Sequence, residues 1–205
     1  ININGDSSFH LMLAAQARGH ELWHYDVRSL ALDTAYDGGE RITCRAAPVT
    51  VQRVEGKHFQ RGDYELIDLG RDIDIVLMRQ DPPFDLGYIT GTHILERLAG
   101  RTLVINDPAS VRNAPEKVMV LDYARFMPPT FVARGLDDVK AFHQRHPGDL
   151  VVKPLHGNGG KAVFRVPADG NNLGALVEMF GQVWPEPFMV QPFLPEVSEG
   201  DKRIV

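Results

Sequence analysis

The sequence has a single cysteine, Cys44, among its 205 residues, so no disulfide can form within the chain. This scarcity fits a protein of the reducing cytosol. An apolar run of about 18 residues and a signal-peptide pattern are both missing, so we expect neither a membrane span nor export. There is no basic excess either, since the formal net charge is −5, which argues against nucleic acid as the main partner. We therefore expect a cytoplasmic globular protein.

An initiator methionine is also missing, because the chain begins with Ile1. Its last residues, Arg203 to Val205, lie in an apolar run. We therefore expect a piece of a longer protein. With a hydrophobic content of 43%, the chain is long enough for one large domain or two small ones around a buried core.

The stretch from residue 150 to residue 166 is the most informative part of the sequence. Val151 and Val152 predict a buried strand, a glycine-rich loop follows, and an extended pattern resumes at Val163. The loop consists of Gly157, Asn158, Gly159 and Gly160, and glycine allows the backbone to approach a ligand closely. With Lys153 and Lys161 on either side, the loop is a candidate cradle for phosphate oxygens.

Three other interpretations of this loop make different demands on the residues after it. A Walker loop needs Ser or Thr after Gly-Lys and then a helix, but Ala162 follows Lys161. A dinucleotide-binding loop must also open a helix, and Val163 to Val166 favours a strand. A plain hairpin turn stays possible. The functional interpretation is a hairpin lid over a nucleotide, with Lys153 reaching the phosphates from its strand.

The first half of the chain has the pattern of a Rossmann-like α/β layer. One helix is expected at residues 9–17, with Asp6, Ser7 and Ser8 as candidates for its N-cap, and another at residues 86–98. Strands are expected at residues 21–25, 42–45, 49–54, 72–78 and 102–106. Arg79 and Asp81 come directly after the fourth of these strands. Because ligands bind at the carboxyl ends of strands in open α/β sheets, we take these two residues as guesses for substrate contacts. An ion pair between layers is the alternative for them.

The second half begins after a candidate linker at residues 107–115. Helices are expected from residue 115 to the prolines at 128–129, at residues 136–146 and at residues 173–180. Strands are expected at residues 130–133 and 187–191, besides the two that flank the glycine loop.

Three segments of the second half resemble the ATP-grasp ligases: Val152-Lys153-Pro154, the glycine loop and Asn113 to Lys117. Further segments are similar to bacterial glutathione synthetases, namely Met78 to Asp85, Gln191 to Glu196 and Gly200 to Ile204. The resemblance implies a Rossmann-like pre-ATP-grasp substrate domain at residues 1–110, without its first strand. It also implies an ATP-grasp domain at residues 111–205, without its C-terminal part.

The resemblance also implies roles for individual residues. Lys117 and Lys153 would bind the phosphates of ATP, and Gly157, Asn158, Gly159 and Gly160 would close over them. The adenine would lie against Gln191, Phe193 and Leu194, and the ribose against Asp201. Arg203 would act catalytically near the transferred phosphoryl group. Without the resemblance, Lys117 and Asp201 could be surface charges, and Phe193 and Leu194 could be core residues.

The implied activity is ATP-dependent formation of glutathione from γ-glutamylcysteine and glycine through an acyl phosphate. Another ATP-grasp carboxylate–amine ligase, or a nucleotide-binding module without turnover, is the alternative. The resemblance implies Mg²⁺ whose ligands lie beyond residue 205, and we expect no metal ligand within this chain. It also implies a homo-oligomer, and the family suggests a tetramer.

Overall fold

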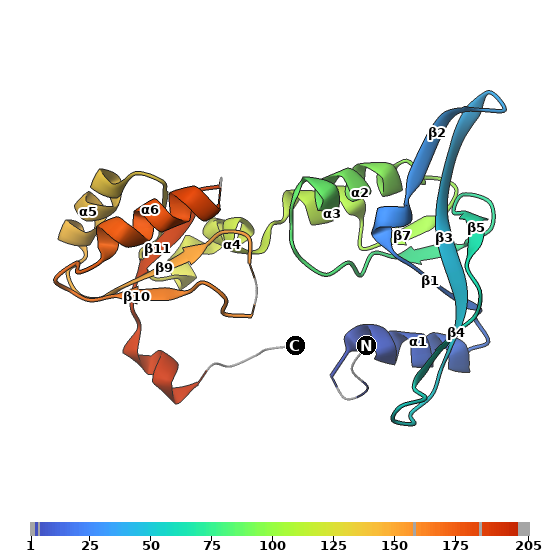
Figure 1. Ribbon diagram of the computed structural model, residues 1–205, viewed down its shortest axis with the longest axis horizontal. Coiled ribbons are helices and arrows are strands. Elements are labelled where there is room, and N and C mark those ends of the chain that lie inside the picture. Colours follow the sequence, from blue (N-terminus) through green and yellow to red (C-terminus); the bar gives the residue numbers. More distant parts are fainter. Residues whose placement is uncertain (1–2, 4, 158, 185, 201–205) are drawn as a thin grey trace. The chain divides into compact units, whose positions relative to one another are not determined.

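The computed structural model describes residue 3 and residues 5–157, 159–184 and 186–200. The chain divides into two compact units, Ile1–Asn113 and Ala114–Val205 (Figure 1). Among the described residues, no helix has both the length and the apolar composition needed to cross a membrane.

An antiparallel sheet built on one long strand dominates the first unit. The long strand is β3 (Gly39–Val51), and it pairs with β1 (Leu22–Tyr25), β2 (Ala31–Tyr36), β4 (Phe59–Arg61) and β5 (Glu65–Asp68). The prediction of two short strands at residues 42–45 and 49–54 is wrong, because residues 42–45 and 49–51 belong to the single strand β3 and residues 52–54 lie beyond its end. Pairing along β3 with four other strands supports its length, and such long-range pairing leaves no local signal in the sequence.

The first helix, α1 (Ser7–Ala17), confirms its prediction. The Asp6 carboxylate accepts hydrogen bonds from the backbone N–H groups of Ser8 and Phe9, which satisfies donors at the start of the helix. Near its end, the Gln16 side chain exchanges two hydrogen bonds with the backbone of Val51, at 2.8 and 2.9 Å. The helix is thereby held against β3.

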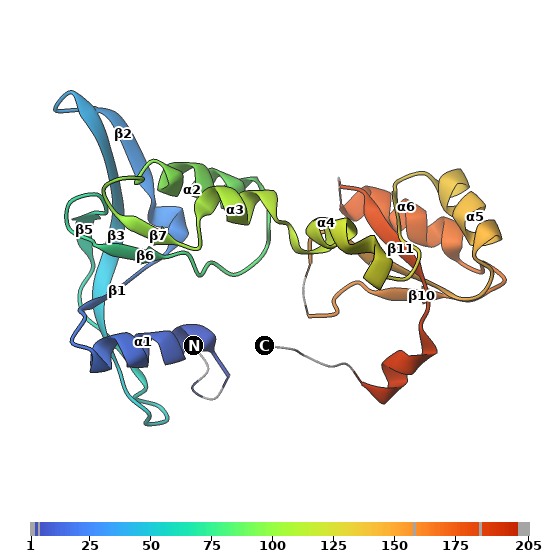
Figure 2. The same ribbon diagram turned by 180° about the vertical axis from the view of Figure 1, so that it is seen from behind.

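The Rossmann-like part of the first unit is a parallel pair of strands joined through a helix (Figure 2). β6 (Ile75–Leu77) leads through α2 (Leu86–Glu96) to β7 (Leu103–Ile105), and both strands are shorter than predicted. The 3₁₀ turn η1 (Val27–Ser29) lies between β1 and β2. Val76, Met78, Leu95 and Leu98 share a buried cluster with Ile42 and Cys44 of β3, so one core unites the two sheets.

A short helix, α3 (Pro108–Asn113), occupies most of the predicted linker. The boundary between the two units, after Asn113, falls within the predicted linker at residues 107–115, but the helix in this segment was not predicted. The carboxylate of Asp107 accepts a hydrogen bond of 2.7 Å from the N–H of Ser110, and Pro108 takes the first helical position. Both are ordinary helix-start signals that the sequence already carried.

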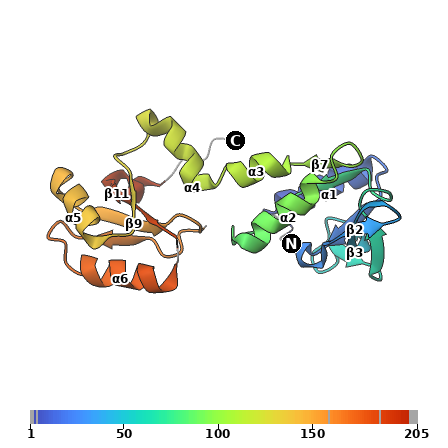
Figure 3. The same ribbon diagram turned by 90° about the horizontal axis from the view of Figure 1, so that it is seen from above.

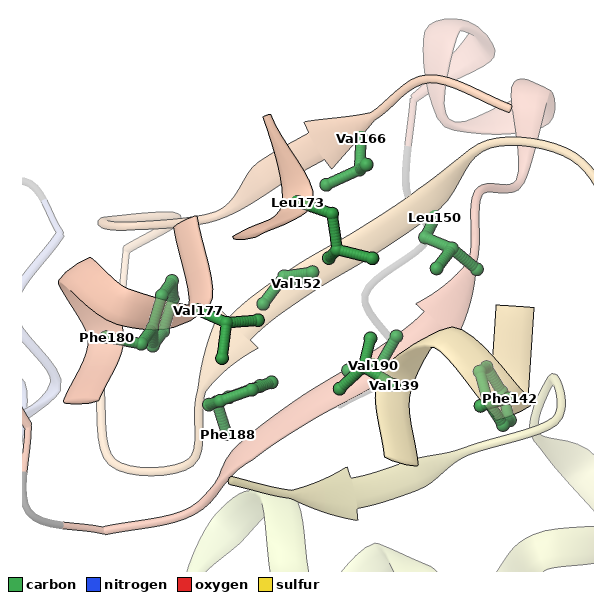
Figure 4. Close-up of a cluster of buried hydrophobic side chains, with 10 residues drawn as sticks. All are labelled: Val139, Phe142, Leu150, Val152, Val166, Leu173, Val177, Phe180, Phe188 and Val190. Atoms are coloured by element: carbon green, nitrogen blue, oxygen red, sulfur yellow. The ribbon is translucent and has the colours of Figure 1, made fainter. Parts of the chain in front are cut away.

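The second unit is a four-stranded antiparallel sheet in the order β10-β9-β11-β8. Its strands are β8 (Phe131–Ala133), β9 (Leu150–Pro154), β10 (Phe164–Val166) and β11 (Phe188–Pro192). The helices α5 (Leu136–Arg145) and α6 (Leu173–Val183) pack against one face. Figure 4 shows the buried side chains of that contact, including Val139, Phe142 and Phe180 from the helices and Val152, Phe188 and Val190 from the strands.

The other face of this sheet points away from α5 and α6. Along β9, Leu150 and Val152 belong to the helix-side core, so Val151 and Lys153 between and after them point to the opposite face. α4 (Glu116–Met119) lies on that side of the sheet and continues into η2 (Val120–Phe126), while α6 lies on the other side (Figure 3). The last element, η3 (Pro195–Glu199), follows β11.

Candidate functional site

The glycine loop joins two antiparallel strands. Residues 155–163 connect β9 to β10, and Val152 pairs with Phe164 across the hairpin. A strand and not a helix follows the loop, so the arrangement differs from Walker and dinucleotide-binding loops, as predicted. Gly159 and Gly160 have φ angles of +64° and +70°, a conformation that glycine adopts without strain. Of the four predicted lid residues, Asn158 lies outside the described residues.

Lys117 contacts this loop from α4. Its Nζ donates hydrogen bonds to the carbonyl oxygens of Gly157 at 2.5 Å and Leu155 at 3.4 Å. The side chain is half-buried, so Lys117 is not a freely solvated residue on a helix surface. The contact brings a positive charge from residue 117 to the beginning of the loop, 40 residues further along the chain.

Lys153 lies on β9 opposite Met189 of β11. Its half-buried position lowers the pKa of its ammonium group, and the positive charge of Lys117 lowers it further, while Glu116 acts in the opposite direction. The two lysines therefore lie near enough to repel each other. Within the described part of the chain neither lysine forms an ion pair. Such a pair of cations favours the binding of an anion between or beside them.

The hinge, which we define as residues 191–194, leaves the end of β11. The buried side chain of Gln191 donates a hydrogen bond of 2.7 Å from Nε2 to Oγ1 of Thr130. Phe193 is half-buried, and Leu194 is exposed and precedes η3. Neither Phe193 nor Leu194 belongs to the helix-side core cluster. The sequence could not decide between a core position and a ligand contact for these two, and their exposure leaves them available for contacts.

Two side chains that hold the hinge could not be picked out from the sequence. The guanidinium of Arg165 lies 4.0 Å from the ring centre of Phe193 and forms an ion pair with Asp149 at 2.5 Å. An arginine on a short strand and an aspartate before another are common on surfaces, so their meeting depends on the strand register. Only the register of β9 with β10 and β11 could have revealed it.

Arg79 and Asp81 follow β6 in the first unit, as predicted, and both are exposed. Nε of Arg79 donates a hydrogen bond of 3.3 Å to Oγ of Ser8, at the start of α1. The ion pairs of the described residues include neither Arg79 nor Asp81. Asp201 and Arg203 lie outside the described residues.

The residues of the site fit a nucleotide better than they fit a metal. Two ammonium groups beside a glycine loop match the charge of a polyphosphate. A search of the described residues finds no group of three or more His, Cys, Asp or Glu side chains that could hold a metal ion.

Two family models match the chain. The model of the prokaryotic glutathione synthetase N-terminal domain matches residues 1–112. The model of the prokaryotic glutathione synthetase ATP-grasp domain matches residues 116–205. Together they span both units of the structure.

Curated relatives match over the whole chain. Glutathione synthetase of Rhodopseudomonas palustris is 50% identical over 205 residues, which are 100% of this chain and 63% of that protein. Glutathione synthetase of Shewanella oneidensis is 39% identical over 206 residues, again 63% of its length. The chain thus spans just under two thirds of the length of these relatives.

Solved structures support the fold. An ATP-grasp RimK domain protein from Sphaerobacter thermophilus matches with a TM-score of 0.56 and 22% identity, over 94% of this chain and 62% of that one. The macrocyclase MdnC from Microcystis aeruginosa, bound with the precursor peptide MdnA, matches with a TM-score of 0.52 and 18% identity, over 94% and 63%. At these identities the similarity concerns the fold alone.

Proposed function

The chain belongs to the prokaryotic glutathione synthetase family, and from this membership we propose that the full-length protein is an ATP-dependent ligase that forms glutathione. Its substrates would be γ-glutamylcysteine, glycine and ATP. The fold is that of the family, a Rossmann-like domain followed by an ATP-grasp domain. We propose residues 1–110 as the substrate domain and residues 111–205 as the part of the ATP-grasp domain that this chain contains.

The observation that carries the proposal is the meeting of Lys117 and Lys153 beside the glycine loop. Among the described residues neither lysine forms an ion pair, and the charge of Lys117 disfavours the charged form of Lys153. Phosphate oxygens between them would remove the repulsion. We therefore assign the phosphates of ATP to these two lysines, and the loop of residues 157–160 to a lid that shields them from water.

The hinge supplies the other end of the nucleotide site. Gln191 and Phe193 lie at the end of β11, beside β9, which also carries Lys153. We assign the adenine to the hinge, through Gln191, Phe193 and Leu194, and the ribose to Asp201. Arg203 would lie at the reacting phosphoryl group, where its planar guanidinium matches phosphate and carboxylate oxygens. Arg79 and Asp81 are our candidates for contacts with the dipeptide.

In the proposed reaction a carboxylate oxygen of γ-glutamylcysteine attacks the γ-phosphorus of ATP, and ADP leaves. The amine of glycine then attacks the acyl carbon, and phosphate leaves with the transferred oxygen. The amide forms as the amine loses a proton. The protein acts mainly by positioning the reactants and by balancing charge. Lys117 and Lys153 would hold the phosphates while the lid excludes water from the acyl phosphate.

Other features of the proposal come from family membership. We expect Mg²⁺ to be held by ligands beyond residue 205. A cytoplasmic location and a homo-oligomer, with the tetramer as the form that the family suggests, complete the proposal. A ligase that joins a different acid and amine is the second candidate, since ATP-grasp proteins of other names share the fold.

An isotope experiment tests the acyl phosphate. γ-Glutamylcysteine labelled with ¹⁸O in its cysteinyl carboxylate is turned over by the full-length protein with ATP, Mg²⁺ and glycine. We expect one labelled oxygen in each phosphate released, because the bond between that oxygen and the acyl carbon breaks when glycine attacks. The phosphate is examined by mass spectrometry. Unlabelled phosphate formed together with glutathione would contradict the acyl phosphate, and phosphate released without an amide product would contradict the ligase.

A further inference from the structure

Asp149, the residue before β9, contacts three separate segments of the second unit. Its Oδ2 accepts a hydrogen bond of 2.6 Å from Nε of Arg165 and forms an ion pair with Nη2 of the same guanidinium, 2.5 Å away. Its Oδ1 accepts one from the N–H of Ala168 at 2.9 Å. Its carbonyl oxygen accepts one from the N–H of Phe193 at 2.8 Å. One residue therefore joins β10, the turn after it and the hinge.

Arg165 completes the contact with the hinge. Its guanidinium carbon lies 4.0 Å from the centre of the Phe193 ring, which is within the range of a cation–π contact. Asp149 holds the same guanidinium through its Nε and Nη2 atoms. The backbone of Phe193 is thus fixed by Asp149, and its ring is fixed by Arg165.

The strand register places this cluster in line with the phosphate lysine. Arg165 of β10 and Gln191 of β11 are both paired with Val151 of β9. Lys153 is two residues further along β9 and points to the same face, a separation of about 7 Å along the strand. The hinge and the lysine are therefore held to one strand at neighbouring positions of one face.

We propose that Asp149 and Arg165 are positioning residues that fix the hinge and thereby set the affinity for the base of the nucleotide. This inference depends on the proposed function, because it takes the hinge as the place of the adenine. Neither residue is a catalytic residue, since each acts through Phe193. Among the described residues the hinge beyond β11 has one backbone hydrogen bond to the sheet, that of Phe193, so the pair supplies a large share of the contacts that orient it.

An ordinary surface ion pair would not have this effect. Isolated exposed pairs contribute little, because solvent screens them and their side chains lose freedom. The side chain of Asp149 is only 25% exposed, accepts hydrogen bonds from two donors and forms an ion pair with Arg165, although the side chain of Arg165 is 59% exposed. We therefore expect the pair to act by orienting Phe193 and the hinge. Removing it should weaken the binding of the adenine base and leave the binding of the phosphates unchanged.

The test compares ATP with inorganic tripolyphosphate, which carries phosphates and no base. Binding of both to the full-length protein is measured by calorimetry in wild type, Asp149→Asn, Arg165→Met and Arg165→Lys. We expect the first two variants to bind ATP about tenfold more weakly, the loss of a charged contact, and tripolyphosphate as wild type does. The ATP affinity of Arg165→Lys should lie between those of wild type and Arg165→Met, because lysine keeps the positive charge but lacks the planar group that stacks on the ring of Phe193.

Asp137→Asn is the matched control. Asp137 lies on α5 of the same unit, its side chain is fully exposed, and it is 4.0 Å from Lys140. This variant removes the same charge away from the hinge and should leave both affinities unchanged. In steady state, the Asp149 and Arg165 variants should raise the KM for ATP and keep kcat within about twofold, which is the pattern of lost uniform binding.

Unchanged ATP affinity in both Asp149→Asn and Arg165→Met would overturn the inference. An equal loss of ATP and tripolyphosphate would also overturn it, because it would mean a general disturbance of the unit. If wild type binds ATP no more tightly than tripolyphosphate, the adenosine part of ATP contributes nothing to the affinity. The assignment of the adenine to the hinge then fails, and the inference fails with it. If wild type binds ATP normally but forms no amide, only the proposed ligase activity fails.

Discussion

Replacing Lys153 with alanine should weaken ATP binding by about 10- to 150-fold, the range that corresponds to the loss of one hydrogen bond to a charged group. The fold should persist, because Lys153 points away from the helix-side core and its charge is disfavoured where it lies. We expect the free energy of unfolding to stay within about 0.5 kcal/mol of wild type. Calorimetric titration with ATP and urea unfolding measure the two quantities.

Lys140→Ala is the control for this substitution. Lys140 lies on α5 of the same unit and is exposed, so its removal changes the net charge equally but should not affect ATP affinity. Wild-type affinity in Lys153→Ala would refute the phosphate role of Lys153. A Lys153→Ala protein that no longer unfolds cooperatively would instead refute its placement outside the core.

The lowered pKa of Lys153 adds a pH dependence to the same prediction. An ammonium group with a lowered pKa loses its proton at a lower pH than an ordinary lysine does, and the neutral amine no longer attracts phosphate. ATP affinity should therefore fall as the pH rises through the lowered pKa. Lys153→Arg should flatten this decline, because arginine stays charged. If ATP affinity falls equally with rising pH in wild type and in Lys153→Arg, the titrating group is not Lys153.

Replacing Phe180 with alanine should lower the free energy of unfolding of the second unit by about 3–5 kcal/mol, the usual cost of removing a large aromatic ring from a core. Phe180 is 1% exposed and contacts the rings of Phe188 and Trp184, at 5.2 and 4.9 Å between ring centres. The cavity would lie between α6 and the sheet. Urea unfolding followed by the fluorescence of Trp184, in a Trp23→Phe background, measures the effect in this unit alone.

Val183→Ala is the comparison on the same helix. Val183 is 57% exposed at the end of α6, so its truncation should change the free energy of unfolding by no more than about 0.5 kcal/mol. Equal losses in the two variants would mean that α6 does not bury Phe180 as described.

The fold class and most helices could be predicted from the sequence, because their signals are local. α1 has its cap at Asp6, α5 has Val139 and Phe142 on one side, and both helices form where expected. The five-stranded sheet around β3 was not predicted, and neither was α3. Pairing of β3 with four strands is a long-range property, whereas α3 was missed although Asp107 and Pro108 marked its start.

The residues of the candidate site also differ in whether a local signal in the sequence marks them. Lys153 and the glycines could be selected from the sequence because a strand, a loop and a strand follow one another within a few residues. The position of Lys117 depends on where α4 lies over the sheet, and only the resemblance pointed to it. Asp149 and Arg165 carry no local signal, since their contact with Phe193 exists only once β10 and β11 flank β9.

The most direct test of the proposed function is the release of ADP by the full-length protein with ATP, Mg²⁺, γ-glutamylcysteine and glycine, each omitted in turn. We predict sustained release only when all four are present, with glutathione formed in equal amount. Sustained release without the dipeptide or without glycine, or no release with all four present, would contradict the proposed function.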